Sequence, residues 1–96
     1  MDDRLQRLSD KAKCLPKAPG VYLMKDDKGR VIYVGKSASL RDRVCTYFQP
    51  ATKLEYKKAP LRDVVVDFDY IQTESEVEAL LAENRLIKDI QLKFNV

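Results

Sequence analysis

Apolar positions in the first third of the chain change from a helical to a strand pattern. Within residues Arg4–Leu15 they recur every three or four positions, which predicts a helix ended by the two prolines that follow. Two short apolar runs, Val21–Lys25 and Arg30–Val34, predict strands. The residues between the runs, Asp26–Gly29, include a glycine that can adopt a positive φ. This part of the chain is therefore expected to form a helix followed by a β-hairpin.

The middle of the chain predicts a second helix and a connector. Ser39 opens the helix, and Asp42 stands three positions later, in the arrangement of an approximate capping box. The expected apolar face of this helix consists of Leu40, Val44, Tyr47 and Phe48. Residues 50–60 are then expected to form an irregular or short helical connector that is rich in lysine.

The last third predicts one strand and one helix. In Val64–Ile71 apolar and aromatic side chains alternate with two aspartates, which is typical of a strand with one covered face. A helix follows from Ser75, where Glu78 completes a second capping box, to about Ile90. The order helix, hairpin, helix, strand, helix favours an α+β fold, in which helices pack on a small three-stranded antiparallel sheet.

Size and charge limit the possible functions without selecting one. The chain has 96 residues, which predicts a single domain over residues 1–96. Its formal net charge of +3, from 18 basic and 15 acidic residues, favours a polyanionic partner only weakly. The sequence contains no apolar run long enough to span a bilayer, and its charged N-terminus does not resemble a secretion signal. The expected location is therefore the cytoplasm, with no membrane partner.

The absence of histidine excludes several kinds of active site. Acid–base chemistry must come from Tyr, Lys, Glu, Asp or water, and not from Ser-His-Asp triads, Cys-His pairs or histidine-based nuclease sites. The two cysteines, Cys14 and Cys45, form no CxxC pair. They are expected to be reduced thiols in or near the core instead of zinc ligands.

Glu83 is the strongest chemical anomaly in the sequence. On a helix its neighbours three and four positions away are all apolar: Ala79, Leu80, Leu86 and Ile87. An ionised carboxylate removed from water needs a compensating metal ion, arginine or hydrogen-bond network. The alternative is a buried ion pair that only holds the fold together.

Two further pairs carry groups that can act on a phosphate. Tyr22 and Tyr33 lie on neighbouring predicted strands, where phenols can position water or accept a proton, although strand tyrosines usually only pack. Arg43 and Tyr47 share one face of the second helix, and a guanidinium at the rim of a core suits a bidentate phosphate grip. The alternative role for Arg43 is an ion pair, for example with Glu83.

Other polar residues are weaker candidates. Gly35-Lys36-Ser37 invites comparison with a nucleotide-binding loop, but the glycine spacing is wrong, so no nucleotide cofactor is expected. Lys36 beside a helix N-terminus can still contact a phosphate, or it can be a solvated lysine of a turn. Asp67 and Asp69 are better explained by an edge role than by metal binding. The lysines of the connector, with Tyr56, can contact a DNA backbone or form a solvated surface: Lys53, Lys57 and Lys58.

Taken together, these residues resemble the GIY-YIG endonuclease family. Its two naming triplets correspond to Gly20-Val21-Tyr22 and Tyr33-Val34-Gly35, with valine in place of isoleucine. Further landmarks follow in order across almost the whole chain. They are most similar to the N-terminal domain of bacterial excision-repair nucleases of the UvrC type: residues 15–24, 32–36, Ser39-Leu40, Arg43, 78–81, Glu83-Asn84, 86–88 and Asn95-Val96. The chain departs from the family at Leu92 and Phe94, where proline and tyrosine are usual.

The resemblance implies a site and a reaction. Glu83 would be the sole protein ligand of a single divalent cation, Mg²⁺ or Mn²⁺. Tyr33 would be the general base or the phenol that orients water, with a cation-bound hydroxide as the rival base, and Arg43 would stabilise charge on the scissile phosphate. The same site would be lined by Tyr22, Lys36, Tyr47 and Asn95. The expected reaction is a nick on the 3′ side of a lesion in double-stranded DNA during excision repair.

The resemblance also implies partners. The excinuclease partner proteins, UvrB loaded by UvrA, would recognise damage and load the full-length protein, of which this chain would be an N-terminal fragment. Two alternatives are another GIY-YIG nuclease, of the homing or structure-selective kind, and a non-catalytic DNA-binding or docking domain on this scaffold.

Overall fold

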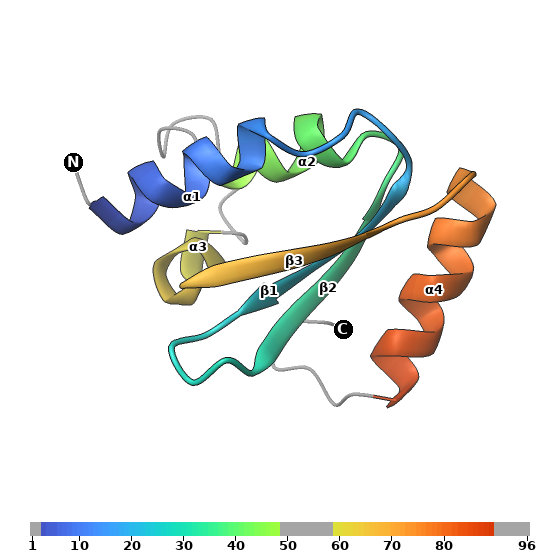
Figure 1. Ribbon diagram of the computed structural model, residues 1–96. Helices are drawn as coiled ribbons and strands as arrows, with labels where there is room; N and C mark the ends of the chain where they lie inside the picture. The colour runs from blue at the N-terminus through green and yellow to red at the C-terminus, as the bar shows by residue number, and fades with distance from the viewer. Residues whose placement is uncertain (1–2, 49–58, 90–96) are drawn as a thin grey trace.

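A computed structural model describes residues 3–48 and 59–89, which fold around a three-stranded antiparallel sheet with the strand order β2-β1-β3 (Figure 1). The α+β fold expected from the sequence is confirmed. The elements follow one another as α1 (Asp3–Lys13), β1 (Gly20–Lys25), β2 (Val31–Ser37), α2 (Leu40–Tyr47), α3 (Ala59–Val64), β3 (Asp67–Gln72) and α4 (Glu76–Asp89).

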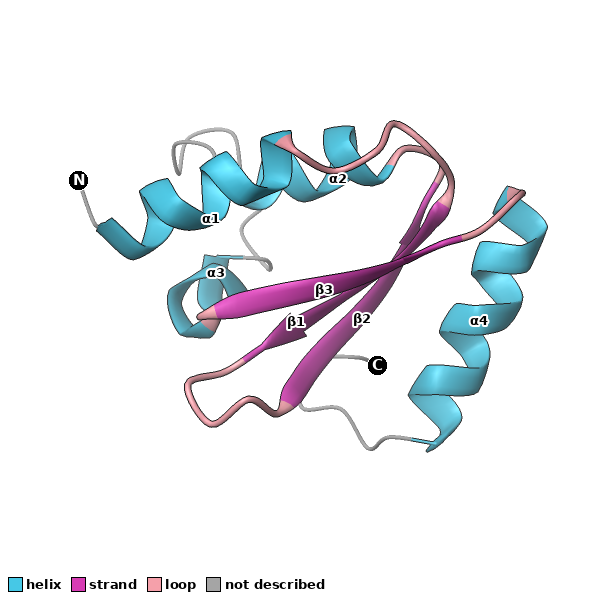
Figure 2. Cartoon of the chain, in the orientation of Figure 1, coloured by secondary structure: helices cyan, strands magenta, loops and turns pink. Residues whose placement is uncertain are grey.

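The helices cover the two faces of the sheet as separate layers (Figure 2). One core, between the sheet and α1, α2 and α3, is built around Leu8, Tyr22, Val44, Leu61 and Phe68. A second, smaller core joins α4 to the opposite face and contains Val21, Val34 and Ala79. Because strand residues alternate between the faces, neighbouring residues of β1 contribute to different cores.

The hairpin and the start of α4 form as their local sequences predict. Gly29 has a φ of 75°, which a side chain would resist, and Asp26 accepts hydrogen bonds from the amides of Lys28 and Arg30. At α4, the Ser75 hydroxyl accepts a hydrogen bond from the amide of Glu78 at 3.1 Å. The second predicted capping box is therefore confirmed on its serine side.

The capping box predicted at Ser39 is wrong. Ser39 is the N-cap of α2, but its side chain makes no capping hydrogen bond. The first amides of α2 instead donate to main-chain carbonyls of the segment before β1: Leu40 N to Ala18 O at 3.0 Å, and Arg41 N to Pro16 O at 3.2 Å. This end of α2 is occupied by protein, so those two amides do not face a phosphate.

Two predicted strand boundaries need correction. β2 continues to Ser37, so Lys36 lies in a strand and not in a turn before α2. The third strand begins at Asp67 and not at Val64, because Val64 ends the additional helix α3.

The helices cover only part of β3. Tyr70 lies on the same face of the sheet as Tyr22, yet 44% of its surface is exposed. The covered face of β3 is therefore limited to its first half.

The edge role expected for the two aspartates of β3 is confirmed. Asp67 forms an ion pair with Lys11 of α1 at 2.7 Å, and Asp69 forms one with Lys25 of β1. β3 is an outer strand of the sheet, so both carboxylates lie where water and lysines can reach them.

The thiols differ from expectation in one respect. Cys45 is half-buried, and burial raises the pKa of its thiol, but Cys14 is exposed and lies outside the core. No helix in residues 3–48 or 59–89 has the length and apolar content needed to cross a membrane.

Candidate active site

Three tyrosines meet on the face of the sheet that α2 covers. Tyr22 is paired with Gly35 and Met24 with Tyr33, so the side chains of Tyr22 and Tyr33 share this face. Tyr47 joins them from the last turn of α2. The Tyr22 ring centroid lies 6.1 Å from that of Tyr33 and 5.7 Å from that of Tyr47. The hydroxyls of Tyr22 and Tyr47 are hydrogen-bonded at 2.9 Å.

Gly35 makes room for the ring of Tyr22. A Cβ atom at position 35 would lie 2.3 Å from the Tyr22 hydroxyl oxygen and 2.4 Å from its Cζ. The phenol of the central strand therefore lies across the backbone of β2, and its hydroxyl reaches toward the outer edge of the sheet. No other residue type at position 35 allows this arrangement without movement of the ring.

Burial keeps two of the three phenols protonated. It raises the pKa of Tyr22 and that of Tyr47 above the usual value, and the shared hydrogen bond and the neighbouring Tyr33 modify both shifts. Phenols with raised pKa values donate hydrogen bonds and are poor bases near neutral pH. Tyr33 differs from these two because it is only half-buried.

Arg43 brings a positive charge to the tyrosines. Its guanidinium interacts with the Tyr22 hydroxyl, and its Cζ lies 5.7 Å from the centroid of the Tyr47 ring. The hydrogen bond with Tyr22 raises the pKa of Arg43, whose charge is thus retained despite partial burial. Arg41 of the same helix is engaged elsewhere, since its Nε donates a hydrogen bond to Leu15 O at 2.7 Å.

Glu83 occupies the predicted helix but not the predicted environment. Its neighbour Ala79 is buried, whereas 41% of Leu80 is exposed and Glu83 itself is half-buried. The expectation of a carboxylate enclosed by apolar side chains is therefore wrong. α4 packs against β2, an outer strand, so the side of the helix that carries Glu83 lies at the rim of the sheet.

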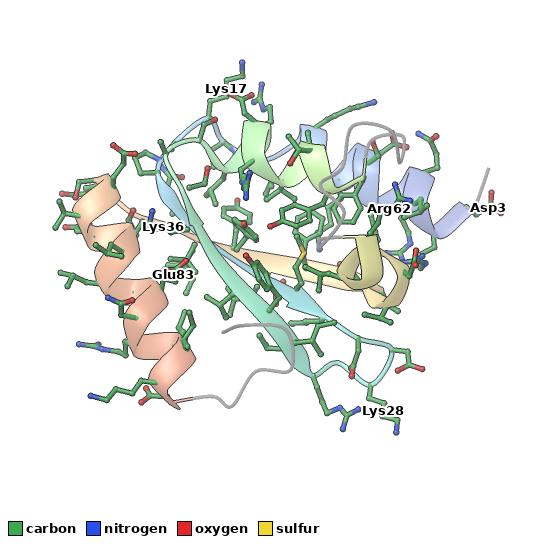
Figure 3. All side chains as sticks on the ribbon, turned by 180° about the vertical axis from the view of Figure 1, so that it is seen from behind. Asp3, Lys17, Lys28, Lys36, Arg62 and Glu83 are labelled. Carbon is green, nitrogen blue, oxygen red and sulfur yellow. The ribbon has the colours of Figure 1, made fainter. Side chains whose placement is uncertain are left out.

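The carboxylate of Glu83 contacts the main chain of β2 and no arginine. Its Oε2 accepts a hydrogen bond from the amide of Lys36 at 2.9 Å. Within residues 3–48 and 59–89 it forms no ion pair, so the alternative of a structural ion pair with Arg43 is not realised there. Figure 3 shows Glu83 and Lys36 side by side between α4 and β2.

The three tyrosines with Arg43 form one group of residues, and Glu83 with Lys36 forms another. The two groups lie on opposite faces of the sheet and approach each other at the edge of β2. Lys36 follows Gly35 in β2, so its side chain points to the face that α4 covers. The tyrosines and Arg43 lie on the other face. Gly35, which carries no side chain, separates the Tyr22 hydroxyl from the amide that holds Glu83. A ligand at the edge of β2 can therefore contact both groups.

The donor chemistry at this edge fits a hard divalent cation. Mg²⁺ is commonly held by one or two carboxylates and keeps several waters. This suits one half-buried carboxylate with an oxygen that none of the described residues bonds to. Among the described residues no three side chains of His, Cys, Asp or Glu come together as a metal cluster. The site fits a hydrated ion bound by Glu83 and does not fit an enclosed structural zinc.

Several predicted site residues lie outside the described residues: Lys53, Lys57, Lys58, Tyr56 and Asn95. Lys36 is exposed at the edge of β2. Sequence reasoning missed the role of its main-chain amide, which no side-chain pattern reveals. It also missed the steric role of Gly35, although this glycine belongs to the second naming triplet. In the structure Gly35 lies within β2, where a glycine often marks a close approach of another group.

Comparison with known proteins gives one family. Residues 18–96 match the model of the UvrC-like GIY-YIG domain. Among curated proteins, the chain is 50% identical over 94 residues to UvrABC system protein C of Caldicellulosiruptor saccharolyticus, covering 93% of this chain. It is 46% identical over 94 residues to the protein of the same name from Pelodictyon phaeoclathratiforme, covering 98% of this chain. In both cases the match spans 15% of the relative's length.

A solved structure extends the similarity to the whole fold. The GIY-YIG N-terminal endonuclease domain of UvrC from Thermotoga maritima, described as bound to its catalytic divalent cation, magnesium, superposes with a TM-score of 0.81. The two chains are 30% identical, and the match covers 100% of each.

Proposed function

The chain belongs to the UvrC-like GIY-YIG family, and on this basis we propose that it is a divalent-cation-dependent endonuclease domain that hydrolyses a DNA phosphodiester. The proposed reaction is the 3′ incision beside a lesion in bacterial nucleotide excision repair. The relatives named UvrABC system protein C and the magnesium-bound endonuclease domain support this assignment. We also propose that residues 1–96 act as one domain of this kind.

The proposal rests on two kinds of charged side chain that lie on either side of the same strand edge. A carboxylate suited to a hydrated cation lies on one side of β2, and an arginine within a tyrosine cluster lies on the other. Phosphodiester hydrolysis needs stabilisation of negative charge more than it needs a covalent catalyst. A cation and a guanidinium facing one phosphate from two sides would provide that stabilisation.

Each residue has a proposed task. Glu83 would hold a single Mg²⁺ or Mn²⁺, which when bound would neutralise charge on the scissile phosphate. Arg43 would bind a phosphate oxygen and stabilise the charge that builds during attack. Tyr33 would accept a proton from the attacking water or orient it. Tyr22 and Tyr47, whose pKa values are raised, would remain protonated and donate hydrogen bonds.

Partners and location complete the proposal. Damaged double-stranded DNA would run along the β2 edge, where Lys36 is exposed. Further contacts to DNA are proposed for Lys53, Lys57 and Lys58, and Asn95 is proposed to line the site. UvrB, loaded by UvrA, would deliver the lesion through the full-length protein, and the reaction would take place in the cytoplasm.

The substitution Glu83→Gln tests the proposal. It removes the charge but keeps the shape, so nicking of a lesion-containing duplex by the full-length protein with its loading partners should disappear. The melting temperature of the domain should change little, because a glutamine oxygen can still accept the hydrogen bond from the Lys36 amide and Glu83 forms no ion pair with the described residues. Glu76→Gln, an exposed position on the same helix, is the charge-matched control and should nick normally. Wild-type nicking by Glu83→Gln in the presence of Mg²⁺ would refute the assignment.

A further inference from the structure

The main-chain amide of Lys36 lies at the edge of β2 that faces away from the other described strands. β2 has β1 as its neighbour on one side, and within residues 3–48 and 59–89 no strand pairs with its other side. The Lys36 amide instead donates a hydrogen bond to Oε2 of Glu83, at 2.9 Å. A peptide N–H of β2 thus fixes a side chain of α4.

This hydrogen bond gives the two carboxylate oxygens of Glu83 different roles. Oε2 is used by the amide, and no second hydrogen bond or ion pair to Glu83 is formed by any other described residue. Glu83 is only half-buried, so packing alone does not select one orientation of its flexible side chain. A hydrogen bond to a charged acceptor is stronger than a neutral one and gives the carboxylate a preferred direction.

We infer that the amide of Lys36 orients Glu83 for the divalent cation, which makes Lys36 a positioning residue through its main chain. The inference rests on the proposed function, in which Glu83 is the cation ligand. Groups that hydrogen-bond to metal ligands fix the geometry of those ligands, and their loss typically weakens metal affinity by about 10- to 100-fold. Here a main-chain N–H at the edge of β2, and not a side chain, would fix the geometry of the ligand.

The lysine side chain and the amide can be separated by substitution. Lys36→Ala removes the exposed amine and keeps the N–H, whereas Lys36→Pro removes the N–H. Proline is tolerated in an outer strand where the missing N–H would have pointed away from the sheet. The two variants therefore distinguish an effect of the main chain from an effect of the side-chain charge.

The experiment measures binding of Mn²⁺ alone to the 96-residue chain by electron paramagnetic resonance, without DNA. Lys36→Pro should bind Mn²⁺ about tenfold more weakly or worse. Lys36→Ala should bind at least as tightly as the wild type, because it keeps the amide and loses a nearby positive charge. Wild-type affinity in a Lys36→Pro chain with a native circular dichroism spectrum would overturn the inference, and so would equal weakening by both substitutions.

A second variant covers the case in which proline prevents folding. Replacing the peptide bond before position 36 by an ester exchanges the N–H for an oxygen and keeps the lysine side chain. The same loss of Mn²⁺ affinity is expected in an ester chain whose circular dichroism spectrum is native. Wild-type affinity in the ester chain would overturn the inference. Glu83→Gln separates this inference from the proposed function: if it binds Mn²⁺ like the wild type, Glu83 is not the ligand and the proposed function fails with it. If Glu83→Gln loses the ion and the proline and ester chains do not, only the positioning role fails.

Discussion

Replacing Gly35 by alanine tests whether the ring of Tyr22 must lie across β2. The added Cβ would be 2.3 Å from the Tyr22 hydroxyl oxygen, whereas ordinary contact begins at 3.4 Å, so the hydroxyl must move by about 1 Å. The ring has little room for this movement, because only 1% of Tyr22 is exposed and the Tyr47 ring centroid lies 5.7 Å away. The displacement should therefore break the hydrogen bond between the two hydroxyls.

The expected magnitudes differ for stability and for activity. Overpacking a core costs about 1–3 kcal/mol, whereas alanine in place of glycine within a strand returns about 0.5–1 kcal/mol. The net loss should therefore lie between about 0 and 2.5 kcal/mol. Each kcal/mol lowers the melting temperature of a domain this size by about 4–8 °C. Misplacing a catalytic constellation by 1 Å can cost about 100-fold in rate. The variant should be folded but nearly inactive.

Gly29→Ala provides a control of similar stability. Gly29 has a φ of 75° and no atom within 4 Å of an added Cβ, so alanine there is strained by about 1–2 kcal/mol without touching the site. Both variants should melt earlier than the wild type in circular dichroism. In a single-turnover nicking assay with the full-length protein and its partners, only Gly35→Ala should fail. Equal nicking by the two variants would refute the role assigned to Gly35.

Three other predictions concern the tyrosines and the arginine. Tyr33→Phe should slow nicking severely and leave DNA affinity by fluorescence anisotropy unchanged; unaltered turnover would move the base elsewhere. Arg43→Ala should lower the single-turnover rate by about 100-fold or more, and a rate close to that of the wild type would contradict its role at the phosphate. Burial raises the pKa of Tyr22 and Tyr47, so the unfolded chain loses these protons first as the pH rises. The free energy of unfolding in urea that these two phenols contribute should be constant from about pH 7 to 9 and should decrease above about pH 10. Tyr47→Phe should make this decrease smaller. An equal decrease in the wild type and in Tyr47→Phe would contradict the burial argument.

Local sequence predicted those parts of the fold that depend on local contacts. The hairpin at Gly29 and the serine cap at Ser75 involve groups within a few residues of one another, so turn and capping rules identify them. The N-terminal end of α2, after Ser39, did not follow such rules. Its first amides donate hydrogen bonds to the carbonyls of Pro16 and Ala18, more than twenty positions earlier in the chain. A carbonyl from a distant segment has no signature in the residues around a helix start.

The environment of Glu83 shows the same limit for the site. Helical periodicity placed it on the side of α4 that bears apolar residues, and this side does pack on the sheet. Its degree of burial depends on where the sheet ends beneath the helix, which the strand order β2-β1-β3 determines. The residue was thus identified by a pattern whose physical interpretation was wrong. A carboxylate at an edge needs no buried partner and is reachable by a hydrated ion.

The strand order also explains how residues on opposite faces of a sheet can serve one site. A third strand could pair with either outer side of the hairpin, and here β3 pairs with β1. Among the described strands, that choice leaves the far side of β2 without a partner. The Lys36 amide is therefore available to Glu83, and the Tyr22 hydroxyl can approach the same edge over Gly35. Had β3 paired with β2, another strand would separate the carboxylate from the tyrosines and use the amide in its own ladder. The chemistry proposed for this domain therefore depends on which edge of the hairpin pairs with β3.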